Sequence, residues 1–103
     1  MTTVVVIDEA EEQLRAIDEW WRANRLEAPM LVVEEFERCT TLLASSPDIG
    51  TGFHRTTIRG VRRLIMKTRH VVYYVHDADN AVVYVIAVWG GAKEGDPVLR
   101  DPR

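Results

Sequence analysis

The 103-residue sequence lacks several features that define whole classes of protein. It holds a single cysteine, Cys39, so it cannot form an internal disulfide, and this fits a reducing compartment. Its longest apolar stretches, such as residues 81–89, are far shorter than the roughly 20 residues that cross a bilayer. The opening segment MTTVVVIDEAEE has no basic start and soon turns acidic, which disfavours a secretory signal. The sequence therefore predicts a cytoplasmic protein without a membrane span.

The short motifs of common catalytic and metal sites are also absent. The sequence has no glycine-rich phosphate loop, no pair of cysteines and no His-Glu metal helix. Its three histidines, His54, His70 and His76, match no metal-binding spacing. We therefore expect neither a metal nor a cofactor. The even spacing of His70 and His76 puts both on one face of a strand, where each would end the strand at the solvent boundary.

Acidic residues are unevenly distributed, and one long stretch has none. Residues 1–50 carry 11 acids and 4 bases (net −7), whereas residues 51–103 carry 5 acids and 9 bases (net +4). No acid occurs from Ile49 to His76, a stretch that contains Arg55, Arg59, Arg62, Arg63, Lys67 and Arg69. Such a patch attracts anionic partners locally, although a net charge of −3 disfavours nucleic-acid binding, and we expect no sequence-specific DNA binding. A solvated strand edge explains the patch equally well.

The apolar pattern predicts one α+β domain spanning residues 1–103. In chain order we expect a strand at residues 2–7, a helix from Asp8 to about Asn24, a helix from about Pro29 to Ser45, and strands at residues 57–66, 70–76 and 81–89. Asp8 is expected to act as an N-cap, and Pro29 to lie in a first helical turn. The helices should form an antiparallel hairpin packed on one face of a single sheet, whose last three strands are antiparallel; residues 91–103 should be an irregular tail.

The faces of these elements can also be predicted. Helical spacing puts Cys39 on the inward stripe of the second helix, as a small buried residue. Trp20 and Trp21 are adjacent and cannot both face the core, so we expect Trp21 to pack inward and Trp20 to face a partner. Regular alternation along the last strand puts one set of side chains on a common face: Val82, Tyr84, Ile86 and Val88.

Three segments of the chain together resemble the RelE/ParE superfamily of toxins from bacterial type II toxin–antitoxin modules. They are VVVIDEAEEQLRAIDEWW, LLASSPDIGTG and GVRRLIMKTRHVVYYVHDADNAVVYVIAVWGG, and the resemblance covers roughly residues 3–92. It implies a toxin that a cognate antitoxin neutralises by direct binding, in a hetero-oligomer. It further implies that the antitoxin's C-terminal segment, typically acidic, folds into a groove on the toxin.

The superfamily has two activities, and the resemblance has to be tested against both. RelE-like members cut mRNA on the ribosome without a metal, whereas ParE-like members are understood to poison DNA gyrase. The residues available for a nuclease are Arg62, Arg63, His70, Tyr74 and Lys93. His70 stands where RelE-like toxins have an arginine, and no tyrosine follows Tyr84. The resemblance is therefore closer to the ParE-like branch and implies a binding-type toxin. A ribosome-dependent endonuclease, or an inactive member that only pairs with its antitoxin, are the alternatives.

Five residues are candidates for partner binding: Trp20, Arg59, Arg62, Arg63 and Trp89. The resemblance puts the arginines beside the antitoxin groove, and guanidinium groups bind paired carboxylates well. We expect this basic rim to contact the antitoxin, the target, or both. Trp89 ends the last strand, where it either covers the core or stands at the target-binding end.

Overall fold

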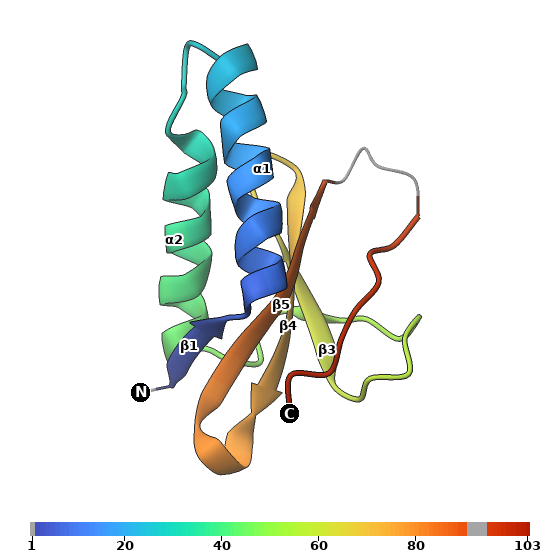
Figure 1. The fold of residues 1–103 in the computed structure, drawn as a ribbon. Helices are drawn as coiled ribbons and strands as arrows, with labels where there is room; N and C mark the ends of the chain where they lie inside the picture. Colours follow the sequence, from blue (N-terminus) through green and yellow to red (C-terminus); the bar gives the residue numbers. More distant parts are fainter. Residues whose placement is uncertain (1, 91–94) are drawn as a thin grey trace.

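The computed structural model, which describes residues 2–90 and 95–103, has one five-stranded sheet with two helices packed on one face (Figure 1). The elements are β1 (Thr3–Val6), α1 (Asp8–Asn24), α2 (Leu31–Ser45), β2 (Thr51–Gly52), β3 (Val61–Ile65), β4 (His70–Asp77), the 3-10 turn η1 (Ala78–Asn80) and β5 (Val82–Gly90). The strand order is β1-β5-β4-β3-β2. The predicted α+β class, helical hairpin and single sheet are confirmed. Neither described helix is long and apolar enough to cross a membrane.

The sheet differs in detail from the predicted one. β1 pairs with β5 in parallel, so the sheet is mixed, and the two-residue strand β2, which was not predicted, pairs with β3. The predicted strand at residues 57–66 was too long, because β3 begins only at Val61. Bends and a turn precede it, and Gly60 there has a φ of 75°, a left-handed conformation that costs glycine little.

The helix boundaries also differ from expectation by one or two residues. Asp8 is the first residue of α1 and not its N-cap, which is Ile7 and makes no side-chain hydrogen bond. Asp8 still lies beside Glu9 and Glu11 in the first turn, where carboxylates favour the positive end of the helix dipole. Pro29 lies in the connection before α2 and not in its first turn. Trp21 ties this connection down, because its Nε1–H donates to the Ala28 carbonyl at 2.9 Å.

A bulge in β5 sets which side chains face the helices. Tyr73 pairs with Ala87 and Tyr74 with Val85, so Ile86 is an extra residue in β5. Val85 and Val88 consequently pack on the helix side, whereas Ile86 and Ala87 both pack on the far side. The predicted alternation, which put Val88 on the face of Ile86, was therefore wrong beyond the bulge.

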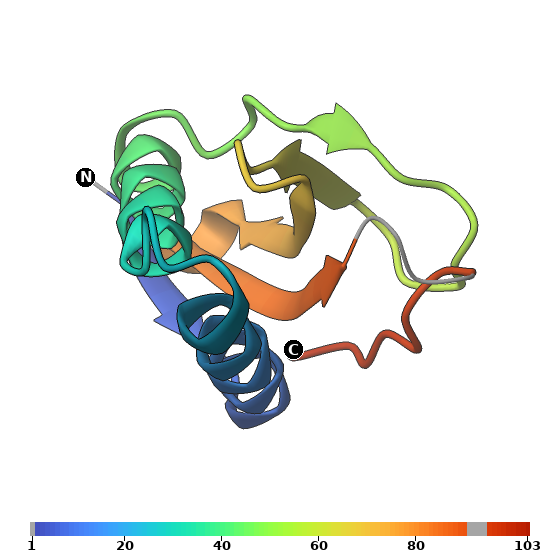
Figure 2. The ribbon, with the colours of Figure 1, turned by 90° about the horizontal axis from the view of Figure 1, so that it is seen from above.

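Each face of the sheet has its own apolar cluster. On the helix face, α1 and α2 pack on β4 and β5 through Ala10, Val32, Phe36, Cys39, Leu43, Val72, Tyr74, Val83, Val85 and Val88, together with Met66 from the β3–β4 turn. The far face carries a second cluster: Phe53, Val61, Tyr73, Val75, Ile86 and Ala87. In Figure 2, seen from above, the helices lie on one side of the sheet, and the loop before β3 and the C-terminal tail lie on the other.

One charged side chain is buried in the helix-side layer. Glu35 of α2 is 4% exposed, and its carboxylate accepts two hydrogen bonds from Arg38, at 3.0 and 3.2 Å. It also accepts the backbone N–H of Lys67 at 2.7 Å, which fastens the β3–β4 turn to α2. The hydrogen bond from Arg38 is the main reason why the pKa of Glu35 lies below its usual 4.5.

We expect Glu35→Ala to lower the free energy of unfolding by about 2–3 kcal/mol, since it leaves a turn N–H and a guanidinium without their acceptor. Glu37→Ala, an exposed change on the same helix, should cost less than about 0.5 kcal/mol. A carboxylate with a lowered folded pKa stabilises the fold above its unfolded pKa and loses this effect as the pH falls through the folded value.

Urea unfolding of wild type and Glu35→Gln at a series of pH values would check the assignment. The stability difference between the two proteins should shrink as the pH falls from about 6 towards about 3. A difference that stays constant over this range would mean that the Glu35 charge does not stabilise the fold.

Candidate partner-binding site

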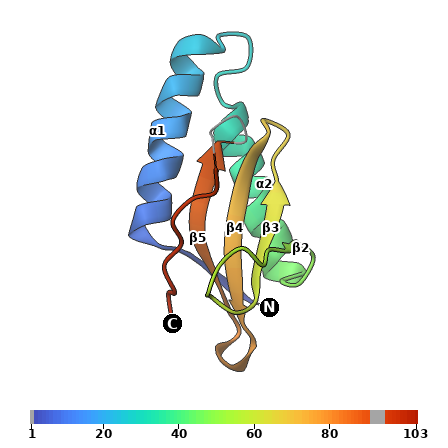
Figure 3. The same ribbon diagram turned by 90° about the vertical axis from the view of Figure 1, so that its right-hand side faces the viewer.

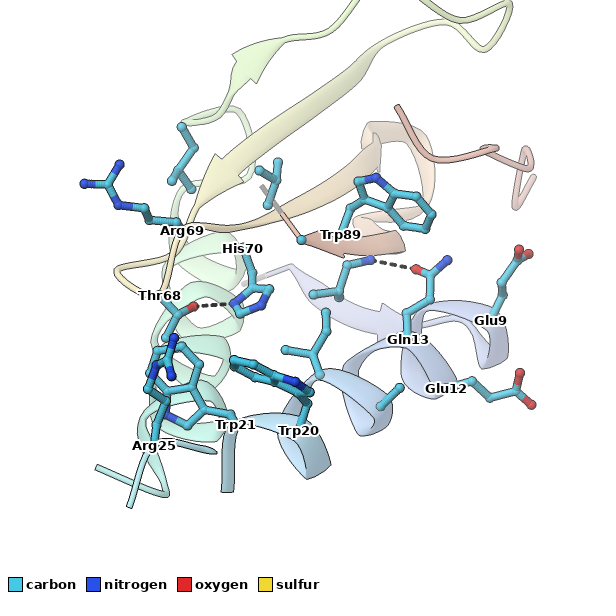
Figure 4. A pocket seen from close by; sticks show the side chains of 16 residues that line it. Glu9, Glu12, Gln13, Trp20, Trp21, Arg25, Thr68, Arg69, His70 and Trp89 are labelled. Atoms are coloured by element: carbon cyan, nitrogen blue, oxygen red, sulfur yellow. Dashed lines mark hydrogen bonds between the residues drawn. The ribbon is translucent and has the colours of Figure 1, made fainter. Parts of the chain in front are cut away.

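An open groove of about 1220 Å³ lies between α1 and the sheet, at the start of β4 and the end of β5 (Figure 4). One wall is α1, and the floor is formed by residues 70–71 of β4 and 88–90 of β5. We call it the α1 groove. Trp20, Trp21 and Trp89 all line it, so two of the predicted partner-binding residues, Trp20 and Trp89, lie in the same groove.

The two adjacent tryptophans divide as predicted. Trp20 is 52% exposed, whereas Trp21 is partly buried against the helix-side cluster. The Arg25 guanidinium lies 4.9 Å from the Trp20 ring and 5.7 Å from the Trp21 ring, positions at which a cation is attracted to the aromatic faces. A large exposed indole beside a positioned cation is a common chemistry of protein-binding surfaces.

His70 and the edge of β5 form much of the floor of the α1 groove. The His70 ring meets the Trp21 ring edge-on at 6.1 Å, its Nδ1 lies 2.8 Å from the Thr68 hydroxyl, and burial lowers its pKa, which favours the neutral imidazole. At the edge of β5, the backbone N–H of Val88 donates to the Gln13 side chain at 2.9 Å. The Gln13 side chain therefore occupies the position at which a backbone carbonyl of a neighbouring strand would accept this hydrogen bond.

Charges of opposite sign mark the two ends of the groove. Glu9 and Glu12 line it near the start of α1, and Arg25 and Arg69 line it near the end. Neither arginine has a carboxylate partner within the described part of the chain. Arg69 has a φ of 72°, a left-handed backbone conformation that is unfavourable for residues other than glycine. At the other end, Glu9 pairs with Arg100 at 3.2 Å. The positive charge near the end of α1 therefore favours acidic groups of a binding segment there.

The predicted basic rim is not one surface. Arg62 pairs with Tyr74 and faces the helix side, where its Nη1 donates to the Gly50 carbonyl at 2.8 Å. Arg63 pairs with Tyr73 and faces the far side, with its guanidinium 5.3 Å from the Phe53 ring. Arg59 is exposed in the turn before β3. None of the three lines the α1 groove. Trp89 lines the groove and also packs against the far-face cluster, the side on which Arg63 lies.

Of the described residues named for a nuclease, only Arg62 and Tyr74 lie together, because they face each other across β3 and β4 and both contact the Gly50 backbone. Tyr74 is fully buried, its hydroxyl oxygen accepts the Gly50 N–H at 2.8 Å, and burial raises its pKa. His70 lies in the α1 groove, while Arg62 and Arg63 lie on opposite faces of the sheet. Lys93 lies outside the described residues. Among residues 2–90 and 95–103, no three His, Cys, Asp or Glu side chains lie close enough to hold a metal ion.

Sequence reasoning did not name Glu9, Glu12, Gln13 or Arg25 as groove residues. It placed Trp21 in the core, and it named Arg69 only as part of the basic stretch. The signal for Arg25 was present, since a residue four positions after Trp21 lies on the same helix face. The role of Gln13 depends on how far β1 extends along β5, and the left-handed backbone of Arg69 leaves no mark in an arginine's identity.

A helical hairpin packed on one face of a single sheet is the arrangement that the resemblance to the toxins of the RelE/ParE superfamily implies. More narrowly, the sequence model of the family described as "ParE toxin of type II toxin-antitoxin system, parDE" matches residues 4–95. The chain therefore belongs to the ParE toxin family.

A solved structure supports the fold. The structure titled "Chromosomal ParDE TA system from P. aeruginosa" superposes with a TM-score of 0.68, over 87% of this chain and 96% of that one. The two share 15% sequence identity, so this likeness shows the fold alone. No curated protein matches the chain in a sequence comparison.

The burial of Tyr74 predicts a structural role. Tyr74→Phe should lower the free energy of unfolding by about 1–2 kcal/mol, because the Gly50 N–H loses its acceptor, and should leave growth inhibition intact. Gly50→Ala should cost about 2–3 kcal/mol, because a Cβ there would lie 2.6 Å from the Tyr74 hydroxyl and 2.8 Å from the Arg63 carbonyl.

In the double variant Gly50→Ala with Tyr74→Phe, the clash with the hydroxyl is gone, whereas those with the ring Cε1 and the Arg63 carbonyl, both at 2.8 Å, remain. The loss of stability should therefore be somewhat smaller than the sum of the two single losses. Urea unfolding and growth after induced expression measure both effects. A folded Tyr74→Phe protein that no longer inhibits growth would contradict the structural role and favour proton transfer by Tyr74.

Proposed function

We propose that this ParE-family chain inhibits growth and is held inactive by a cognate antitoxin whose C-terminal segment folds into the α1 groove. The observation that carries the proposal is the exposed Trp20 in a large apolar groove of a toxin-family fold. Burying such an indole in a protein interface contributes strongly to affinity, because the ring is large and rigid. The toxin and antitoxin then form a hetero-oligomer in the cytoplasm.

The end charges of the groove give the antitoxin segment a direction. Acidic residues of the segment meet Arg25 and Arg69 near the end of α1, and basic or neutral residues meet Glu9 and Glu12 near its start. The opposite direction would put like charges together at both ends. Of the other predicted contacts, Arg59 and Arg63 are better placed for a second segment of the antitoxin or for the target, because they lie away from the groove.

The cellular target that we propose is DNA gyrase, which the toxin would poison by binding and without chemistry of its own. Support comes from the state of the nuclease candidates: Arg62 and Tyr74 lie together, but the Tyr74 hydroxyl is buried and engaged with Gly50, and Arg63 faces the opposite side of the sheet. A metal-free ribonuclease needs an acid, a base and cations around one phosphate.

Trp20→Ala should weaken antitoxin binding by roughly 30-fold or more, as expected for an interface hot spot, and change stability by less than about 0.5 kcal/mol because the side chain is exposed. Leu26→Ala is the matched control, since Leu26 is 79% exposed in the α1–α2 connection and does not line the groove. Isothermal titration calorimetry with the purified antitoxin measures the affinity of each variant, and urea unfolding measures its stability. Equal affinities for the two variants would place the antitoxin elsewhere.

Induced expression of the chain alone, with pulse labelling of DNA and protein synthesis, tests the target. We expect DNA synthesis to stop first and cleaved gyrase–DNA complexes to be recovered, because a gyrase poison acts on replication directly. Co-expression of the antitoxin is the control and should restore both syntheses. Protein synthesis stopping first, with mRNA cut at ribosomal positions, would favour the ribonuclease alternative instead.

A further inference from the structure

Residues 95–103 fold back across the far face of the sheet, in front of β5 in Figure 3. We call this segment the C-terminal strap. Pro97 is buried and Leu99 packs against the far-face cluster, whereas Val98 between them is 80% exposed. At its start, the Trp89 indole N–H donates to the Gly95 carbonyl at 3.3 Å. The strap therefore covers apolar surface with only two of its side chains.

The polar contacts of the strap are weak ones. Asp96 pairs with Arg55 at 3.1 Å, Arg100 pairs with Glu9 at 3.2 Å, and Arg103 donates to the Arg59 carbonyl at 3.0 Å. In both ion pairs the arginine is more than 70% exposed, and an ion pair open to solvent adds little to stability. Between residues 95–103 and residues 2–90, no backbone–backbone hydrogen bond is present. Such a segment opens without unfolding the sheet beneath it.

The surface beneath the strap has a distinct chemistry. Its floor is apolar and aromatic, with Phe53 and Tyr73 in edge-to-face contact at 5.2 Å. Arg55 and Arg63 hold their guanidinium groups 5.6 and 5.3 Å from the Phe53 ring. An aromatic floor beside two guanidinium groups fits an aliphatic side chain with carboxylates close by. The strap has part of this pattern, because Asp96 pairs with Arg55 and Leu99 packs against the far-face cluster. Asp101 pairs with Arg103 of the strap itself, which leaves Arg63 without a carboxylate from the strap.

We propose that the far face beneath the strap is a second docking surface, which takes an acidic segment of a partner protein anchored by an aliphatic residue, and that the strap is its intramolecular competitor. The family match ends at residue 95, so nearly all of the strap lies beyond the part shared with the family model. The surface is reached from the side of the sheet opposite the helices. Its test uses the isolated chain, so it stands or falls separately from the toxin assignment.

The test opens the strap in the full chain and offers it back in trans. In the double variant Asp96→Lys with Leu99→Ser, the ion pair to Arg55 becomes a repulsion and the apolar anchor is lost. Val98→Ser is the matched control, because it changes an exposed neighbour of the same strap. The probe is a fluorescent peptide of residues 95–103, GDPVLRDPR, and its binding is followed by fluorescence anisotropy.

We expect the opened variant to bind this peptide at least tenfold more tightly than wild type or Val98→Ser. A peptide with serine in place of its leucine should bind at least tenfold more weakly than the unchanged peptide. A folded double variant that binds neither peptide at millimolar concentration would overturn the proposal, as would equal binding of both peptides. Tighter binding of a single-stranded oligonucleotide than of the peptide would also overturn it, because the far face would then be a nucleic-acid surface.

If the double variant does not fold, the wild-type chain gives the same answer. Saturating unlabelled peptide should displace the strap, so the Leu99 methyl resonances of the isotope-labelled chain should move to the positions of a solvent-exposed leucine. Leu99 resonances that stay unchanged, at peptide concentrations where the resonances of Phe53 and Tyr73 also do not shift, would overturn the competition.

Discussion

The pairing of β4 with β5 determines where the α1 groove and the far face of the sheet lie. These strands form the middle of the sheet, and their one irregularity is the bulge at Ile86. Beyond the bulge, Val88 faces the helices and its N–H points to the outer edge of β5, where β1 has already ended. Gln13 of α1 accepts that N–H. An edge closed by one side chain, and not by another strand, leaves room for an open groove beside it.

Those parts of the fold that depend on local periodicity were predictable. Cys39 lies buried on the inward stripe of α2 as its spacing predicts, because side chains three and four positions apart share a helix face. The bulge was not predictable, since Ile86 and Ala87 are both apolar and suit either face of a sheet covered on both sides. The parallel pairing of β1 with β5 joins segments about 80 residues apart, and no local signal in the chain encodes it.

The candidate site shows the same division. The exposure of Trp20 followed from its adjacency to Trp21, because neighbouring residues cannot share a helix face. The separation of Arg62 from Arg63 follows from the strand period of two, because neighbouring residues of a strand face opposite sides of the sheet. The prediction of a single basic rim did not take this alternation into account. The groove itself arises from the distance between α1 and the sheet edge, which is a property of packing and not of any short segment.

Two links connect the α1 groove with the far face. Trp89 lines the groove and also donates to the strap at Gly95, while Glu9 lines the groove and pairs with Arg100 of the strap. The hydrogen bond is long and the ion pair is exposed, so each contributes at most about 1 kcal/mol. An occupant of the groove that broke both would ease release of the strap by at most about 30-fold. Coupling of this size makes binding at one surface more favourable when the other is occupied, but binding at neither surface requires it. A partner with two binding segments therefore gains most of its affinity from the covalent linkage between those segments.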